Sequence, residues 1–358
     1  MLAEKKKILI LYAPLGAGHG RAAEALREAF TFYYPGFEVK SISALDFSFW
    51  PYKKFLPGLF HYLSSKASFI YSWLYKNLNH DSGYKFFDYT MDLFIKKKNF
   101  INFVKDFNPD FIIATNPFPM HLVSFTKHEK IINIPSANVC TDFGFHATWF
   151  NSDVNYYFVG EENIKESLVK SGADSEKVFV TGIPISKKFL NVSENRNGKT
   201  LMIVGGKMSC GLLRKVIKEI KLKNSFIRFI IIAGREKKLL NCSVGERILG
   251  FVNNIEEFMA QSDLILTKAG GLTVSECMQM SLPMVINDFL PGQEEDNVDF
   301  VVKNGAGIKI KNNKESAQKI LDLFSNPEKL AEMKKNCKRI ARPEAAEKIV
   351  DFIANKLV

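Results

Sequence analysis

Several patterns that identify common classes of protein are missing from this 358-residue sequence. Its five cysteines include no Cys-x-x-Cys pair, so the sequence predicts neither a disulfide framework nor a zinc site and favours reduced thiols. No apolar run approaches the roughly 20 residues that a membrane-spanning helix needs. The charged N-terminus also lacks the apolar stretch of a signal peptide. We therefore expect a cytoplasmic protein that does not span the membrane.

Familiar cofactor motifs are also absent. The turn at Gly16–Gly20 has the pattern Gly-x-Gly-x-Gly, and no acidic residue ends the following strand, so a dinucleotide site is not predicted. No Gly-x-x-x-x-Gly-Lys motif is present, which makes ATP at a P-loop unexpected. No Asp-x-Asp pair occurs, so a metal bridging phosphates has no obvious ligands. We expect the protein to use no metal and no cofactor.

Nucleic-acid-binding patterns are missing too, although the net charge is +11. Without a helix-turn-helix, RRM or zinc-finger pattern, we expect no nucleic acid partner. The positive charge then favours an anionic lipid surface, with a general excess of surface lysine as the alternative.

The composition that is present is that of a globular protein. Hydrophobic residues make up 46% and charged residues 24% of the chain, and the length favours two domains. Buried-strand patterns followed by glycine turns and helical patterns begin near Ile8 and again near Thr200. We predict an α/β fold with domains over residues 1–185 and 200–342, and a final helix over 343–358.

The segment from Phe47 to Leu78 has the most unusual composition. It alternates aromatic residues with lysines and contains no acidic residue. Such side chains suit the headgroup layer of a membrane, and the prominent candidates are Trp50, Phe55 and Trp73. An aromatic helical segment packed on the first domain is the alternative. Pro51, Pro57 and Gly58 predict that its first half is broken.

The stretch from Leu266 to Asn297 carries the strongest chemical signal. A strand runs into Lys268-Ala269-Gly270-Gly271-Leu272-Thr273 and then a helical pattern, which is how an α/β protein builds an anion site. Glu276 is expected in the first turn of that helix. The following loop offers Gln293, Glu294 and Asn297, which suit vicinal hydroxyls. This order predicts a nucleotide-sugar site.

A second candidate site follows the first strand. His19 lies at the expected helix start, where a neutral imidazole can accept a hydroxyl proton. Asp142 precedes His146 and Trp149 in a later loop. Asp142 could orient an imidazole or bind a hydroxyl, and helix capping is the alternative.

Together these segments resemble the diacylglycerol glycosyltransferases, which include bacterial processive glucosyltransferases and plant monogalactosyldiacylglycerol synthases and are related to the peptidoglycan N-acetylglucosaminyltransferase. The resemblance rests on the segments at 268–273 and 291–297 and recurs at 16–20 and 141–149. It departs from the family at Gly205–Gly211, where Lys207 and Met208 replace further glycines.

The resemblance implies the GT-B arrangement, in which two doubly wound Rossmann-like domains face a cleft. It implies that His19, aided by Asp142, acts in catalysis and that the acceptor or membrane is met by Trp50, Phe55, Trp73, His146 and Trp149. It also implies a UDP-sugar as substrate, on the donor residues Gly18, Phe251, Val252, Lys268, Gly270, Gly271, Leu272, Thr273, Glu276, Gln293, Glu294 and Asn297.

The expected reaction is transfer of a hexose, with glucose favoured, to diacylglycerol by an enzyme on the inner face of the cell membrane. Two alternatives stay open. One is a transferase of the same fold that acts on a polyprenyl-linked cell-wall precursor. The other is a regulator that binds a nucleotide sugar without catalysis.

Overall fold

The computed structural model describes residues 5–16, 18–79, 96–204, 208–234, 236–310 and 315–357. The predicted glycine turn at 205–207 therefore lies outside the described residues. The chain divides into two compact units. The first comprises Met1–Lys187, Pro291–Gln293 and Arg342–Val358, and the second comprises Lys188–Leu290 and Glu294–Ala341.

The first unit contains a six-stranded parallel sheet in the order β2-β1-β3-β4-β5-β6. Its strands are β1 (Lys7–Tyr12), β2 (Glu38–Ser43), β3 (Phe111–Ala114), β4 (Ser136–Val139), β5 (Tyr156–Val159) and β6 (Val178–Val180). Its α-helices are α1 (Gly18–Tyr33), α2 (Trp50–Lys66), α3 (Ser68–Leu78), α5 (Lys97–Phe107), α6 (Pro117–His128), α7 (Glu162–Lys170) and α16 (Ala345–Leu357). The 3₁₀ turns are η1 (Ala44–Phe47), η2 (Ala147–Trp149) and η3 (Ser175–Lys177).

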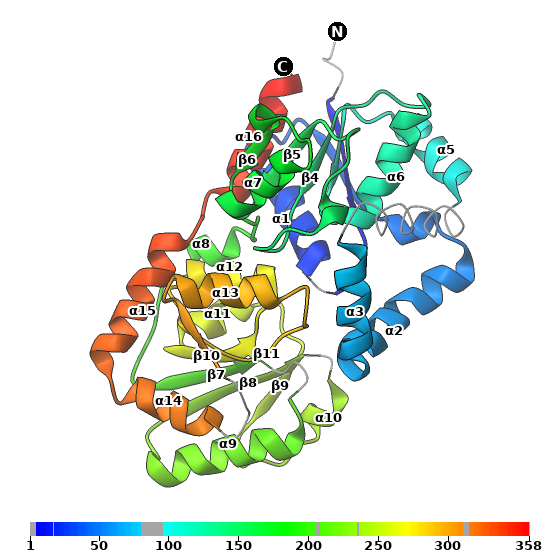
Figure 1. Ribbon diagram of the computed structural model, residues 1–358. Coiled ribbons are helices and arrows are strands. Elements are labelled where there is room, and N and C mark those ends of the chain that lie inside the picture. The colour runs from blue at the N-terminus through cyan, green and yellow to red at the C-terminus, as the bar shows by residue number, and fades with distance from the viewer. Residues whose placement is uncertain are drawn as a thin grey trace. The chain divides into compact units, whose positions relative to one another are not determined.

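Both faces of this sheet are covered, as Figure 1 shows for α1 and α16 on one side and α5 and α6 on the other. Ile8 and Ile10 join the core under α1 and α16, whereas Leu9 and Leu11 join the core on the opposite face. Successive strand residues point to opposite faces, so a strand buried on both sides must be apolar throughout. The run at β1 meets this requirement.

The final helix, α16, packs against α1 in the first unit. The Tyr33 hydroxyl donates to Glu347 and the Tyr34 hydroxyl to Asp351, each at 2.9 Å. These two bonds add to the apolar contact of α16 with the sheet, in which Ile349 and Ile353 are fully buried.

The second unit contains another six-stranded parallel sheet, in the order β12-β11-β10-β7-β8-β9. Its strands are β7 (Thr200–Val204), β8 (Arg228–Gly234), β9 (Ile248–Gly250), β10 (Leu264–Lys268), β11 (Met284–Asp288) and β12 (Gly307–Lys309). Its helices are α8 (Lys188–Asn191), α9 (Cys210–Lys223), α10 (Lys237–Leu240), α11 (Ile255–Ala260), α12 (Gly271–Gln279), α13 (Glu295–Lys303), α14 (Ser316–Phe324) and α15 (Pro327–Ile340). In Figure 1, α9 and α14 cover one face of this sheet, and α11, α12 and α13 cover the other. The α/β fold with two doubly wound units is confirmed.

The predicted break in the aromatic segment is wrong in its position. Helix α2 continues through Pro57, and the break between α2 and α3 falls at Ala67. Pro51 lies in the first turn of α2, where a missing N–H costs nothing. Pro57 removes one helical hydrogen bond, and Lys53, whose carbonyl would have accepted it, is exposed to water.

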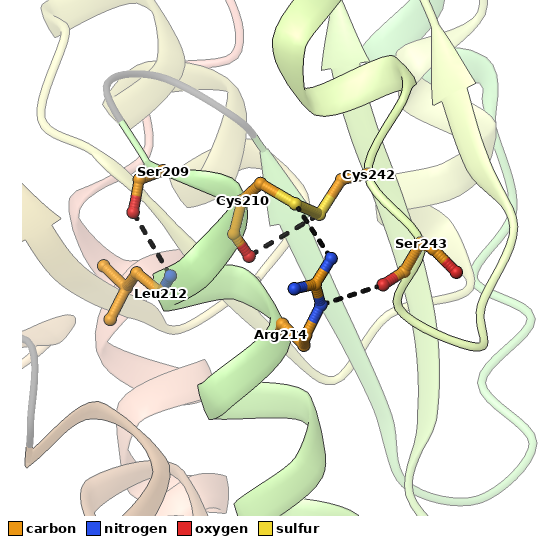
Figure 2. The surroundings of a disulfide bond; sticks show 6 residues. All are labelled: Ser209, Cys210, Leu212, Arg214, Cys242 and Ser243. Atoms are coloured by element: carbon orange, nitrogen blue, oxygen red, sulfur yellow. Dashed lines mark hydrogen bonds between the residues drawn. A yellow bond between two sulfur atoms is a disulfide. The ribbon is translucent and has the colours of Figure 1, made fainter.

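The prediction of reduced thiols throughout is also wrong, because Cys210 and Cys242 form a disulfide (Figure 2). They are 32 residues apart in sequence, so a search for closely spaced pairs does not find them. The fold brings them together because Cys210 begins α9 and Cys242 follows α10. The other three cysteines, Cys140, Cys277 and Cys337, are buried thiols.

Candidate functional site

The first candidate site lies where three neighbouring strands of the first sheet end. Strands β1, β3 and β4 are adjacent and parallel, so the residues that follow them lie at one edge of the sheet. His19, in the first turn of α1, follows β1, while Thr115 follows β3 and Thr141 follows β4. These residues meet through hydrogen bonds to the imidazole.

The imidazole of His19 is held in one tautomer. Its Nδ1 lies 3.1 Å from the Thr115 carbonyl oxygen and 2.8 Å from the Thr141 hydroxyl. A carbonyl oxygen only accepts, so Nδ1 carries the hydrogen and Nε2 is the nitrogen that can take up a proton. The Thr115 hydroxyl donates to the His19 carbonyl at 3.0 Å and fixes the backbone as well.

Desolvation by burial lowers the pKa of His19 from 6.5 to about 4, and the hydrogen bond to the Thr115 carbonyl opposes part of that change. The residue as a whole is partly exposed. His19 is therefore neutral at pH 7 and able to act as a base.

We expect His19 to make folding stability depend on pH between about 6.5 and 4. The unfolded chain takes up a proton near 6.5, and the folded chain only near 4, so stability falls as the pH drops through this range. Thermal unfolding of the wild type and of His19→Gln at closely spaced pH values measures this. The glutamine variant should lose this part of the dependence. Identical pH profiles for the two proteins would contradict the lowered pKa.

Asp142 and His146 lie in the loop that follows β4. Asp142 is buried, with 7% of its surface exposed. The His19 Nδ1 lies within hydrogen-bonding distance of Thr115 and Thr141. Neither threonine is predicted as a site residue from the sequence, although Thr141 directly precedes Asp142. Both threonines follow buried strands of the same parallel sheet, and this position is the sequence feature that could have identified them.

His146 is buried and bonded on both sides of its ring. Nε2 donates to the Tyr75 carbonyl at 2.9 Å, and Nδ1 accepts from the Thr148 backbone N–H at 3.2 Å. Asn79 accepts from the Ala147 N–H at 2.8 Å. These bonds fasten the C-terminal end of α3 to the loop that contains Asp142. Trp149 is 3% exposed and packs in the core of the first unit.

The three other candidate acceptor residues are at the surface. Trp50 and Phe55 on α2 are 65% and 62% exposed, and Trp73 on α3 is 58% exposed. Lys54 lies over the rings of Trp50 and Phe55, at 5.0 and 5.9 Å from their centroids. Gly18 is the first residue of α1, next to His19.

The second candidate site lies in the second unit, where β10 leads into α12. Gly270 is the N-cap residue, and no side chain caps this helix in the described part of the chain. The N–H groups of Gly271, Leu272 and Thr273 belong to its first turn and have no acceptor within the helix. Together with the helix dipole they favour an anion.

The loop before α13 supports this helix start. Asn297 is fully buried, and its amide donates to the Ala269 carbonyl at 2.9 Å. Glu294 accepts from the Leu290 N–H at 2.6 Å and pairs with Lys268 at 2.9 Å. Asn297 and Glu294 thus hold Ala269 and Lys268, the two residues that precede the N-cap of α12.

The remaining donor candidates differ in their exposure. Glu276 is the sixth residue of α12, so it lies in the second turn and not in the first as predicted, because the helix begins at Gly271. Its side chain is 1% exposed. Phe251 and Val252 follow β9, and Phe251 is 63% exposed. Gln293 groups with the first compact unit.

Comparisons with known proteins cover nearly the whole chain. Residues 19–185 match the model of the monogalactosyldiacylglycerol (MGDG) synthase family, and residues 200–349 match the C-terminal domain of glycosyltransferase family 28. Processive diacylglycerol beta-glucosyltransferases of Bacillus cereus (strain 03BB102) and Bacillus thuringiensis (strain Al Hakam) are 31% and 30% identical. Both alignments cover 98% of this chain and 94% of the relative.

Solved structures support the fold. Acinetobacter baumannii MurG has a TM-score of 0.62 and 14% identity, covering 98% of this chain and 99% of that one. The Staphylococcus aureus MnaA–UDP structure has a TM-score of 0.64 and 15% identity, covering 98% and 97%. These neighbours show the GT-B fold class. With relatives about 30% identical over nearly its full length, the chain belongs to the diacylglycerol glycosyltransferase family.

Proposed function

We propose that this protein transfers a hexose, with glucose favoured, from a UDP-sugar to diacylglycerol at an anionic membrane surface, with neither a metal nor a cofactor. The observation that carries this proposal is the alignment of 98% of the chain with enzymes named processive diacylglycerol beta-glucosyltransferases. The two candidate sites supply the chemistry that such a reaction needs.

The nucleotide part of the donor binds to the second unit in this proposal. The first turn of α12 takes the diphosphate on its N–H groups, with the Lys268 ammonium nearby. Glu276 binds the ribose hydroxyls, the backbone at Phe251 and Val252 binds the uracil, and Gln293, Glu294 and Asn297 serve the sugar. Dipoles aimed at the leaving diphosphate are worth several kcal/mol at the transition state.

The acceptor binds to the first unit. The hydroxyl oxygen of diacylglycerol attacks the anomeric carbon of the sugar while the bond to UDP breaks, and the hydroxyl proton passes to Nε2 of His19. The Thr115 carbonyl and the Thr141 hydroxyl support this step because they keep the hydrogen of the neutral ring on Nδ1. Asp142 lies in the loop that also contains Thr141 and orients the acceptor hydroxyl.

The membrane contact is assigned to α2 and α3. Within the described residues, no helix has the length and apolar character that crossing a bilayer requires. Helix α3 has no buried residue even though most of it is apolar. Among the residues that the structure describes, half of the eighteen exposed large hydrophobic side chains lie between residues 49 and 74, namely Phe49, Trp50, Phe55, Leu59, Tyr62, Phe69, Ile70, Trp73 and Leu74. Aromatic rings beside lysines suit a headgroup layer, and an anionic one best.

Transfer itself is the test. The purified protein is incubated with EDTA, labelled UDP-glucose or UDP-galactose, and vesicles containing diacylglycerol and an anionic phospholipid. Thin-layer analysis should show labelled glycosyldiacylglycerol, with more product from UDP-glucose. If label appears only in a polyprenyl-linked precursor, that lipid and not diacylglycerol is the acceptor. Binding of UDP with no product from any lipid would favour a regulator.

A Gly270→Ala variant tests the donor helix. The backbone of Gly270 is extended (φ −69°, ψ 134°), and an added Cβ would lie 3.6 Å from the Glu294 Oε1 atom, which is an ordinary contact. The fold should therefore tolerate alanine. The methyl group would occupy the space where a phosphate meets the helix start, so we expect affinity for UDP to fall about tenfold.

Calorimetric titration with UDP and thermal unfolding measure the two effects separately. Gly36→Ala is the matched control, because an added Cβ there meets nothing within 4 Å. It should leave both affinity and stability unchanged. Wild-type affinity in Gly270→Ala would remove this helix start from the donor site.

A further inference from the structure

The disulfide joins two segments of the second unit that follow neighbouring strands of its sheet. Cys210 is the first residue of α9, which follows β7, and Cys242 follows α10, which comes after β8. Strand β7 pairs with β10 in parallel, so α9 and α12 both begin at the carboxyl edge of the same sheet. The cross-link therefore fixes a helix start next to the one assigned to the diphosphate.

The two sulfur atoms have different surroundings, as Figure 2 shows. Cys210 is half-buried at the N-terminal end of a 14-residue helix, and the Arg214 guanidinium lies 3.6 Å from its sulfur. A cation and a helix N-terminus both stabilise a thiolate. Cys242 is 6% exposed, and its sulfur lies 3.5 Å from the Cys210 carbonyl. In the reduced protein, Cys210 is the sulfur equipped to react with solutes.

A hollow of about 440 Å³ lies beside the pair, lined by Arg214, Ile217, Lys218, Lys221, Leu222, Ser243 and Val244. Three of these residues are cationic, and Ser243 directly follows Cys242. The surface next to Cys210 therefore favours anionic reagents. A peptide thiol with carboxylates, such as glutathione, has that charge.

The other three thiols are unsuited to the same reaction. Cys140, Cys277 and Cys337 are buried. Burial raises the pKa of Cys337 to about 12 and that of Cys140 well above its ordinary value. A thiol reacts with disulfides only as the thiolate, so oxidation should select the Cys210–Cys242 pair.

We propose that Cys210 and Cys242 form a reversible thiol modification site, at which anionic low-molecular-weight disulfides oxidise the pair and thereby fix the start of α9 beside the donor site. The Cys210 thiolate attacks a disulfide RSSR, forming a mixed disulfide and releasing one thiolate. The Cys242 thiol then loses its proton to solvent and displaces the second RS⁻ from the sulfur of Cys210. One disulfide is reduced to two thiols as the protein pair is oxidised.

Reduction leaves the segment after α10 attached to α9. Arg214 Nε donates to the Ser243 carbonyl at 3.1 Å, and Lys221 pairs with Glu246. Reduction instead allows the first turn of α9 more conformational freedom.

The expected effect on affinity for the donor rests on the proposed function. A fixed helix start is preorganised, so the oxidised form should bind UDP more tightly.

The experiment is a redox titration of the full-length protein in glutathione buffers, followed by acid quenching, alkylation of the unfolded chain so that buried thiols also react, and intact mass measurement. The expected result is a reversible loss of two alkylation sites together, while three sites persist. Cys242→Ser should accumulate a glutathione adduct on Cys210, and Cys210→Ser should stay largely unmodified. Five alkylated thiols at every glutathione ratio, or an adduct that forms mainly on Cys242, would overturn the proposal.

The same titration with saturating UDP tests the link to the donor. By reciprocity, UDP should shift the ratio of disulfide to dithiol about fivefold or more toward the disulfide. An unchanged ratio, when thermal unfolding shows that UDP is bound, would overturn the coupling. If the disulfide forms reversibly but the protein does not bind UDP, the proposal of a thiol site stands and the proposed function is overturned.

Discussion

A His19→Ala enzyme should transfer sugar to diacylglycerol at least about a hundredfold more slowly than the wild type, with affinity for UDP nearly unchanged. Loss of a positioned general base typically costs 10²–10⁴-fold in rate. The diphosphate is assigned to the N–H groups in the first turn of α12, and His19 supplies none of these groups, so affinity for UDP should not depend on the imidazole. Initial rates at saturating donor, with calorimetric titration of UDP, measure both quantities.

Thr141→Val provides the graded control. It removes the hydroxyl 2.8 Å from Nδ1 but keeps the Thr115 carbonyl, which holds the same tautomer. We expect its rate to fall only a few-fold. If His19→Ala keeps transfer within a few-fold of wild type, His19 has no role as the base. If UDP affinity falls along with the rate, the residue supports the donor site instead.

Replacing four exposed aromatics, Trp50, Phe55, Phe69 and Trp73, by serine should release the protein from anionic vesicles. These side chains are 58–83% exposed. Partial burial of each in a membrane is worth about 1 kcal/mol, and together about 4 kcal/mol, or roughly a thousandfold in the partition coefficient. Vesicle sedimentation at several lipid concentrations measures that coefficient. Tyr75 is kept, because its ring lies 4.1 Å from that of His146 and its carbonyl accepts from His146.

The matched control for this variant is Leu222→Ser with Phe226→Ser. These two side chains in the second unit are 76% and 87% exposed, so their loss also lowers surface hydrophobicity. Vesicle binding should survive in the control. Equal binding by the quadruple variant and the wild type would show that α2 and α3 do not meet the membrane.

Much of the fold was predictable from local pattern. The run at β1 is apolar without interruption, as burial on both faces of a parallel sheet requires, and the glycine turn before α1 marks the change to helix. The prolines of α2 led to a wrong prediction because Pro51 lies in the first turn and Lys53, four residues before Pro57, is exposed. A rule that uses the sequence alone cannot tell that Lys53 is exposed to water.

The parts of the candidate sites that lie within one continuous segment of the sequence were predictable. Lys268 to Thr273 forms a strand end, a turn and a helix start, so neighbouring residues in sequence define the whole feature. The partners of His19 come from two other strands, 96 and 122 residues away. No spacing rule links such residues, which is also why the pairing of Cys210 with Cys242 was not predicted.

By itself, the sequence determined the α/β class, the helix start near residue 270 and the aromatic segment, because each follows from the chemistry of adjacent residues. Only the tertiary structure decided which ring nitrogen of His19 can accept a proton, which aromatics face solvent and which two sulfurs meet. These properties depend on the order of strands in each sheet, and that order places residues distant in the chain within hydrogen-bonding or covalent reach.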